Sequence, residues 1–216
     1  MDQNSRHVAA QLRKPSGLEA YKVADKLNKV NGETNLAAIA AMGINANDRV
    51  LEIGPGNGKF AESIISSASD VTYAGLDWSQ EMVDAASQLN APLIQAGKAT
   101  FSVGTSAEIP FADKEFTKAI SVHTIYFWEE PRSHLHEIKR VLKTGGQLCL
   151  CFGDESFMKS LPFVQFGFQL YDKKKAESCL AESGFKIAKA LTYTEIGRSN
   201  SGGFVEKLIN ILVCST

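Results

Sequence analysis

The sequence lacks a large net charge, and this absence bears first on its partners. Its 216 residues include 23 lysines and arginines against 24 aspartates and glutamates, a formal net charge of −1. A broad electrostatic attraction to nucleic acid or to an anionic membrane needs an excess of positive charge. We therefore expect neither a nucleic-acid partner nor a membrane partner.

Long hydrophobic runs are also missing. No apolar stretch approaches the roughly 18 residues of a membrane-spanning helix, and residues 1–17 lack the apolar core of a signal peptide. The chain is accordingly expected to be cytoplasmic. Its 44% hydrophobic and 22% charged residues are ordinary for a globular protein, and its length suffices for one sizeable α/β domain.

Residues that bind metal are sparse and poorly spaced. The four cysteines form no C-x-x-C pair and are expected to be buried thiols: Cys149, Cys151, Cys179 and Cys214. His134 and His136 fall on an expected helix, but a spacing of two residues turns them to different faces. His7 falls in a terminal segment that we expect to be mobile. No metal site is expected.

The most informative segment is VLEIGPGNGKF, from Val50 to Phe60. It is typical of a buried strand, a glycine-rich turn and the start of a helix, and glycine lets a ligand approach the backbone closely. It is no phosphate P-loop, because Phe60 stands where serine or threonine is required. It also departs from the dinucleotide fingerprint, because Lys59 occupies the position of the third glycine. The turn alone indicates a ligand without naming it.

An acidic residue follows the next expected strand. That strand runs from Val71 to Leu76, and Asp77 comes 77 − 58 = 19 residues after Gly58. In doubly wound sheets an acid about 20 residues past the glycine turn binds the ribose hydroxyls of a nucleotide. The ordinary alternative is a helix-capping acid before Ser79. The glycine turn that precedes it favours the ribose role.

Four motifs in this order resemble the class I S-adenosylmethionine-dependent methyltransferases: VLEIGPGNG, GLDWSQEMV, GTSAEIPF and RVLKTGGQLCLCF. The resemblance is strongest over Asp48 to Phe152 and is nearest to the small-molecule methyltransferases. It implies an enzyme that uses S-adenosyl-L-methionine as cofactor and transfers its methyl group to a small-molecule acceptor. The chain has no Asn-Pro-Pro-Tyr or Asp-Pro-Pro-Tyr tetrapeptide, the motif of methyltransferases that modify amino groups of bases or glutamine.

The order of expected elements predicts a Rossmann-like, doubly wound α/β sheet of seven strands, mostly parallel, with helices on both faces. Strands are expected at 50–53, 71–76, 99–103, 117–122, 147–152, 185–193 and 208–214, and helices at 18–27, 36–42, 59–69, 79–89, 132–142 and 173–183. We expect the fifth helix to stop at Gly145-Gly146. The short loop near 197–203 makes the last strand antiparallel. Residues 1–216 are expected to form one methyltransferase domain, with 1–47 an N-terminal helical cap and 48–216 the α/β core.

The resemblance also implies the cofactor-binding residues, which should lie at the carboxyl ends of the strands. The glycine turn lies under the methionine part, where its amides at Gly56 to Gly58 can serve the carboxylate, and Glu52 faces the cationic end. Where the family often has an acid or amide for adenine, this chain has Thr105. The Thr105 hydroxyl can accept one hydrogen bond, and the alternatives are Ser106 and the backbone of Ala107. The predicted set is Glu52, Gly54, Gly56, Asn57, Gly58, Asp77, Trp78, Met82, Thr105, Ser106, Ala107 and His123.

The segment after the fourth strand is predicted to face the acceptor. There, His123 is the candidate general base, because the ordinary pKa of histidine is near 6.5; the alternative is that it only packs against the cofactor. An aromatic segment, 156–171, follows the fifth strand on the same side. With the N-terminal helices it predicts an apolar acceptor pocket, whose candidate residues are Tyr21, Tyr126, Trp128, Phe163 and Phe166.

Two other functions stay open from the sequence alone. One is an NAD(P)-dependent oxidoreductase, against which Lys59 and the reversed last strand count. The other is a non-catalytic protein that keeps the fold and binds S-adenosylmethionine or a partner, against which the intact glycine turn and Asp77 count. The protein is expected to be a monomer or a homodimer.

Overall fold

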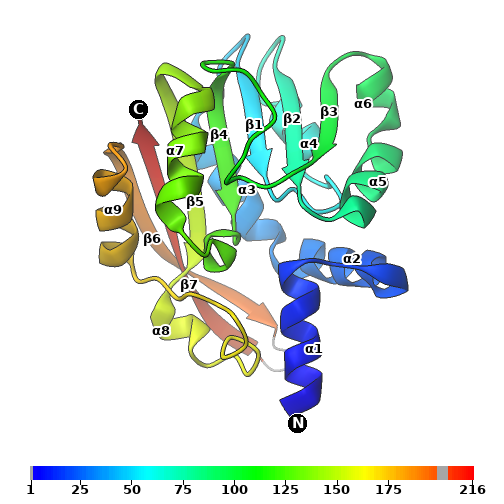
Figure 1. The fold of residues 1–216 in the computed structure, drawn as a ribbon, viewed down its shortest axis with the longest axis vertical. Helices are drawn as coiled ribbons and strands as arrows, with labels where there is room; N and C mark the ends of the chain where they lie inside the picture. The colour runs from blue at the N-terminus through cyan, green and yellow to red at the C-terminus, as the bar shows by residue number, and fades with distance from the viewer. Residues whose placement is uncertain (1, 199–203) are drawn as a thin grey trace.

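A single sheet of seven strands forms the middle of the molecule in the computed structural model, which describes residues 2–198 and 204–216 (Figure 1). The strands lie in the order β3-β2-β1-β4-β5-β7-β6. They are β1 (Arg49–Ile53), β2 (Thr72–Asp77), β3 (Ala99–Val103), β4 (Phe116–Val122), β5 (Leu142–Gly153), β6 (Lys186–Arg198) and β7 (Phe204–Ser215). The pairs from β3 through β5 are parallel, whereas β7 is antiparallel to both of its neighbours. The predicted fold class is confirmed, with the reversed strand lying inside the edge strand β6.

The centre of the sheet lies at β1, which is apolar on both faces. Val50 and Leu51 are fully buried on opposite sides, as a central parallel strand requires. β1 pairs with β2 on one side and with β4 on the other. The strand order therefore reverses between β1 and β4, and ligands bind at such a point, outside the carboxyl ends of the strands.

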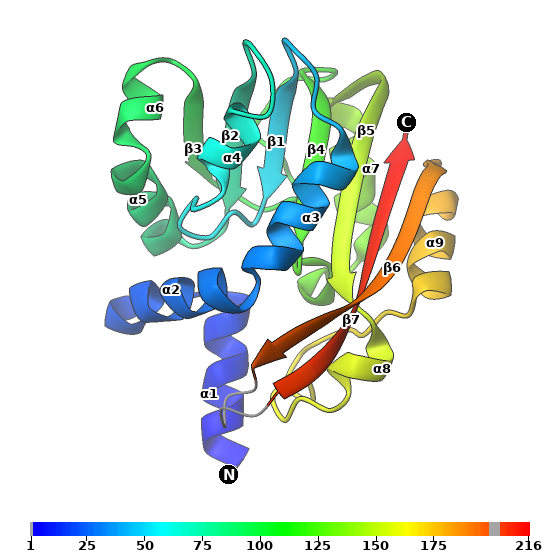
Figure 2. The ribbon, with the colours of Figure 1, turned by 180° about the vertical axis from the view of Figure 1, so that it is seen from behind.

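Helices cover both faces of the sheet (Figures 1 and 2). α3 and α4 lie on the face that Figure 2 presents, and α7 and α9 lie on the other. The helices are α1 (Asp2–Arg13), α2 (Ala20–Val30), α3 (Gly32–Met42), α4 (Ala61–Ile65), α5 (Gln80–Leu89), α6 (Ala91–Gln95), α7 (Pro131–Val141), α8 (Glu155–Met158) and α9 (Lys173–Glu182), with 3-10 turns η1 (Gly17–Glu19) and η2 (Ile125–Phe127). No helix among the described residues is both long and apolar enough to traverse a bilayer.

The predicted N-terminal cap divides into two parts. α3 packs on the sheet, where Ala38 and Met42 join the core formed with β1, β4 and β5. α1 and α2 instead extend past the carboxyl ends of the strands (Figure 1). The helical layer over the strand ends thus comes from residues 2–30 alone.

Several predicted boundaries were wrong for local reasons. α1 was not predicted, and the segment expected to be mobile is a helix in which His7 contacts Glu19. The predicted helix 59–69 spans only Ala61–Ile65. α7 ends at Val141 and β5 begins at once, so Gly145, at φ +76°, lies inside the strand instead of stopping a helix. The hairpin of β6 and β7 extends beyond 193 and before 208, and its predicted loop, 197–203, lies mostly outside the described residues.

Candidate functional site

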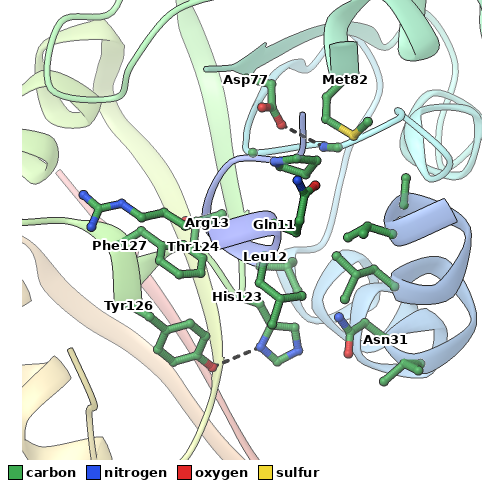
Figure 3. A pocket seen from close by; sticks show the side chains of 18 of the residues that line it. Gln11, Leu12, Arg13, Asn31, Asp77, Met82, His123, Thr124, Tyr126 and Phe127 are labelled. Atoms are coloured by element: carbon green, nitrogen blue, oxygen red, sulfur yellow. Dashed lines mark hydrogen bonds between the residues drawn. The ribbon is translucent and has the colours of Figure 1, made fainter. Parts of the chain in front are cut away.

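A cavity of about 790 Å³ lies at the carboxyl ends of β1, β2 and β4, where the strand order reverses. This volume falls within the range of about 300–1,000 Å³ that is common for small-molecule sites. The loops after these strands form one wall, and α1 and α2 lie across it (Figure 3). The segment after α8 and the end of the β6–β7 hairpin complete the cavity.

The glycine turn after β1 borders the cavity with its backbone. Gly54 and Gly56 have φ of +72° and +56°, which favours glycine. A Cβ on Gly54 would come within 2.5 Å of the Thr124 side chain. The amide of Gly56 donates to Asp77 Oδ2 at 3.0 Å, and that of Gly58 donates to the Pro55 carbonyl at 3.0 Å. Both of these amides therefore have acceptors within the chain. The role of the turn toward the cofactor carboxylate stays a prediction.

Asp77 ends β2 with its carboxylate held from two sides. Oδ1 accepts from the amide of Ser79 and Oδ2 from the amide of Gly56, both at 3.0 Å. The residue is only 7% exposed, and this burial raises the pKa of the carboxyl while the amides oppose the rise. Each oxygen keeps a lone pair, so the fixed carboxylate can accept hydrogen bonds from two adjacent hydroxyls.

Glu52 is a second buried acid on the same wall. It accepts a hydrogen bond from the Tyr73 hydroxyl at 2.6 Å. Burial raises the pKa of Glu52 to about 7, and the nearby Asp77 adds to the rise. The group therefore titrates near neutral pH, and a bound cation would favour its ionised form.

Glu52 makes the empty protein less stable as the pH rises. Its folded pKa of about 7 lies above the ordinary glutamate value of 4.5, so the native state binds more protons than the unfolded chain between these pH values. The free energy of unfolding falls through this window, by roughly 3 kcal/mol in total. We expect Glu52→Gln to melt at a higher temperature than wild type at pH 8 and at a similar temperature at pH 5.

Thermal denaturation of the ligand-free proteins at both pH values measures this effect. The control is Glu108→Gln, because Glu108 is exposed outside the cavity and should behave like wild type at both. Other titrating groups, among them His123, cancel in the comparison with wild type. A Glu52→Gln variant that melts with the same pH dependence as wild type would contradict the raised pKa.

Further residues of the predicted cofactor-binding set lie along the next part of the wall. Trp78, Met82, Thr105 and Ser106 all border the cavity. The indole of Trp78 donates to the Arg13 carbonyl at 2.8 Å, which ties this wall to the end of α1. The structure thus brings four predicted residues together beside Asp77.

His134 also borders the cavity here, although sequence reasoning gave it no role. Its Nδ1 lies 2.7 Å from Ser106 Oγ, and its ring stacks on Trp128 at a centroid distance of 5.2 Å. Partial burial lowers the pKa of His134 to about 4. Ala107 is exposed and does not border the cavity, and its amide donates to Thr105 Oγ1 at 3.2 Å.

Gly58 likewise lies away from the cavity wall. It has φ +67°, and a Cβ there would come within 2.8 Å of Asn90 and 2.9 Å of Phe101. Its carbonyl accepts from the Asn90 amide. Gly58 therefore allows the turn to pack closely against Asn90 and Phe101. The neighbouring Asn57 borders the cavity, and its side-chain oxygen accepts a hydrogen bond from Asn28 at 3.1 Å.

Three of the five predicted acceptor residues, Tyr126, Trp128 and Phe163, border the cavity. The other two do not: Tyr21 is 48% exposed on α2, and the ring of Phe166 lies under the guanidinium of Arg6 at 5.0 Å. Phe157, Leu161 and Phe168, from the predicted aromatic segment 156–171, also border the cavity, although none was named as a candidate. Leu12, Phe127 and Lys207 were not named either and lie on the same wall. Its character is mainly apolar and aromatic.

His123 follows β4 in a left-handed conformation, with φ +58°. Its amide donates to the Cys151 carbonyl at 2.9 Å, and its Nδ1 lies 3.0 Å from the Tyr126 hydroxyl (Figure 3). Its Nε2 is buried without a hydrogen-bond partner within residues 2–198 and 204–216. Burial, with the positive charge of Lys207, lowers the pKa of His123 to about 4.

A buried ion pair closes the same end of the cavity. Lys207 on β7 and Glu195 on β6 face each other across the hairpin, with Nζ 2.8 Å from Oε1. Nζ also donates to the Val30 carbonyl at 2.6 Å, and Glu195 Oε2 accepts from Thr34 at 2.5 Å. The pair therefore fastens the hairpin to α2 and α3. The spacing of the two residues in the sequence gave no sign of it.

Comparisons with known proteins agree with this geometry. Residues 51–150 match the family described as "Methyltransferase domain". The O-methyltransferase rstn1 of Aspergillus nomiae is 30% identical over 161 residues, 71% of this chain and 69% of that protein. The O-methyltransferase resE of Aspergillus sclerotiorum is 26% identical over 191 residues, 84% of this chain and 68% of that protein.

A solved structure described as an S-adenosylmethionine-dependent methyltransferase from Aquifex aeolicus superposes with a TM-score of 0.68 at 16% identity, over 97% of each chain. This likeness shows the fold, and the O-methyltransferase relative that is 30% identical shows the family. The chain belongs to the S-adenosylmethionine-dependent methyltransferase family. It is an enzyme with S-adenosylmethionine as cofactor. This result excludes the two alternatives, a nicotinamide-dependent oxidoreductase and a non-catalytic protein.

The wall described above fits that cofactor. Two buried carboxylates, Glu52 and Asp77, share one cavity with the indole of Trp78 and the thioether of Met82. Carboxylates suit the cationic groups and the ribose hydroxyls of the molecule, and the indole and thioether suit its purine. When bound, S-adenosylmethionine contributes an electrophilic methyl group on a sulfonium.

Proposed function

We propose that the protein transfers the methyl group to a small organic acceptor. The observation that carries this proposal is the apolar half of the cavity, whose lining includes Phe127, Phe163 and Phe168. An aromatic-lined space under α1 suits a molecule of limited size. The O-methyltransferase relatives support the same conclusion.

We further propose how the first half of the cavity holds the cofactor. Asp77 accepts the ribose hydroxyls, Glu52 faces the cationic end, and Trp78 and Met82 enclose the adenine. The hydroxyls of Thr105 and Ser106, the latter 2.7 Å from His134 Nδ1, are the polar side chains available to the adenine amino group. Holding two reactants in line can contribute about 7–11 kcal/mol to a transfer of this kind.

The proposal includes partners and location. The near-neutral charge supports an enzyme that needs no nucleic acid and no membrane surface. We propose that it acts in the cytoplasm as a monomer or homodimer.

Transfer of a radioactive methyl group tests the acceptor class directly. The purified protein is incubated with S-adenosylmethionine labelled in its methyl group and with a cell extract separated into metabolites, RNA and protein. We expect label in the metabolite fraction, and none with the Asp77→Ala variant. Label confined to RNA or protein would refute the proposal.

A further inference from the structure

The hydrogen bonds of Tyr126 determine which nitrogen of His123 carries a proton. The Tyr126 oxygen accepts from the amide of Gly153 at 2.5 Å. Its own proton has two possible acceptors, Nδ1 of His123 at 3.0 Å and the carbonyl of Gly153 at 3.4 Å. Hydroxyl hydrogen bonds are normally near 2.7–2.8 Å, so a contact of 3.4 Å is weak. The hydroxyl therefore donates to Nδ1.

This assignment makes Nε2 a donor. A neutral imidazole has one N–H, and a ring whose Nδ1 accepts must carry its proton on Nε2. That N–H is buried and has no partner among the described residues, while the ring borders the cavity. In Figure 3 the ring extends from the Tyr126 hydroxyl toward the side where Asn31 lies. An oxygen of a bound ligand would satisfy it once the side chains that cover Nε2 move aside.

Burial, reinforced by the positive charge of Lys207, keeps His123 neutral. The charges of Lys207 on β7 and Glu195 on β6 act on the ring in opposite directions, and the Tyr126 hydroxyl lies 3.0 Å from its Nδ1. The ammonium of Lys207 borders the cavity and uses two of its three N–H groups, on Glu195 and Val30. The third has no partner within the described parts of the chain. With a pKa of about 4, His123 is a weak base for any hydroxyl of ordinary acidity.

We propose that the methyl acceptor is an acidic enol or phenol on a flat apolar frame, which binds as an oxyanion to the Nε2–H of His123. The inference rests on the proposed function and defines its acceptor class. The ionised oxygen donates the electron pair of the new O–CH₃ bond while the C–S bond breaks toward sulfur. The oxyanion and sulfonium charges cancel, and no proton is removed. His123 therefore acts as a hydrogen-bond donor, in place of the general base predicted from the sequence.

A probe whose ionisation is visible tests the preference for an oxyanion. 7-Hydroxycoumarin is a flat phenol whose absorbance changes when it ionises. Bound to the protein–S-adenosylhomocysteine complex, it should titrate at least about one pKa unit lower than in solution, because a site that prefers the anion tenfold shifts the pKa by one unit. Its isomer 4-hydroxycoumarin, a much more acidic enol, should bind at pH 6 at least about tenfold more tightly.

Two variants separate a donor from a base. His123→Gln keeps an N–H donor but no base, and His123→Leu keeps neither, while both carry similar backbone strain at φ +58°. The glutamine variant should retain most of the pKa shift of the probe and the leucine variant should lose most of it. Circular dichroism and calorimetry with S-adenosylhomocysteine check that both fold and bind the cofactor product.

The outcomes are distinct. The inference would be overturned if the pKa of the bound phenol were unchanged or raised. It would also be overturned if the His123→Gln variant lost as much of this pKa shift as the His123→Leu variant. Failure of both coumarins to bind a complex that holds S-adenosylhomocysteine would overturn it as well. Failure of the wild-type protein to bind S-adenosylhomocysteine would instead count against the proposed function itself.

Discussion

Replacing Asp77 by alanine is expected to lower the affinity for S-adenosylhomocysteine about 100-fold. The carboxylate is buried at the end of β2, and amides of Ser79 and Gly56 hold it in place. A hydrogen bond to a charged group contributes about 1.5–3 kcal/mol, and a tenfold change in affinity corresponds to about 1.4 kcal/mol. The variant loses two hydrogen bonds to the ribose, but it no longer has a carboxylate to desolvate when the ligand binds. The two effects together give a loss of about 100-fold. Titration calorimetry measures it.

Two further variants make the result specific. Asp77→Asn keeps one acceptor oxygen but cannot accept the Gly56 amide through its NH₂ group, so its affinity should be intermediate. His123 lies beyond the proposed ribose position, so His123→Ala should change the affinity for S-adenosylhomocysteine less than about threefold. Equal binding by Asp77→Ala and wild type would refute the ribose role.

Replacing Lys207 by methionine should destabilise the protein by about 3–5 kcal/mol, because it leaves the buried Glu195 without a counter-charge. The Val30 carbonyl also loses its donor. Urea denaturation followed by circular dichroism gives the change in unfolding free energy. The exposed pair of Arg132 and Glu182 provides the control, and Arg132→Met should cost less than about 1 kcal/mol.

The double variant Glu195→Leu/Lys207→Met decides the cause of that loss. If the penalty comes from an uncompensated charge, replacing both members with apolar side chains should restore most of the stability. The cost of the double variant should then be well below the sum of the two single costs. Additive costs would show that the two residues stabilise the hairpin independently.

The sequence was sufficient for the central part of the fold and for the cofactor side of the cavity. Buried strands, a glycine turn and an acid after β2 are local patterns, and the parallel sheet brings their ends together. The positions of Asp77, Trp78 and Met82 on one cavity follow from this. The functions of these side chains stay predictions until binding is measured.

The opposite side of the cavity depends on information that the sequence does not contain locally. Lys207 and Glu195 face each other only because of the register of β6 and β7, and both strands were predicted too short. Tyr21 was assigned to the acceptor pocket without knowledge of the rotation of α2 about its axis, which turns it outward. α1 was missed because its sequence, DQNSRHVAAQLR, has few apolar residues to reveal a buried face.

The two halves of the cavity have separate origins along the chain. The family match, 51–150, contains the turn after β1, Asp77 and the wall beside it. Much of the opposite half comes from α1 and α2 before that segment and from α8 and the hairpin after it. The side chains of Trp78 and Ser79 connect the two halves, because they donate hydrogen bonds to the carbonyls of Arg13 and Pro15. Such a division is modular: we expect that exchange of the flanking segments changes the choice of acceptor in part, while the donor half stays unchanged.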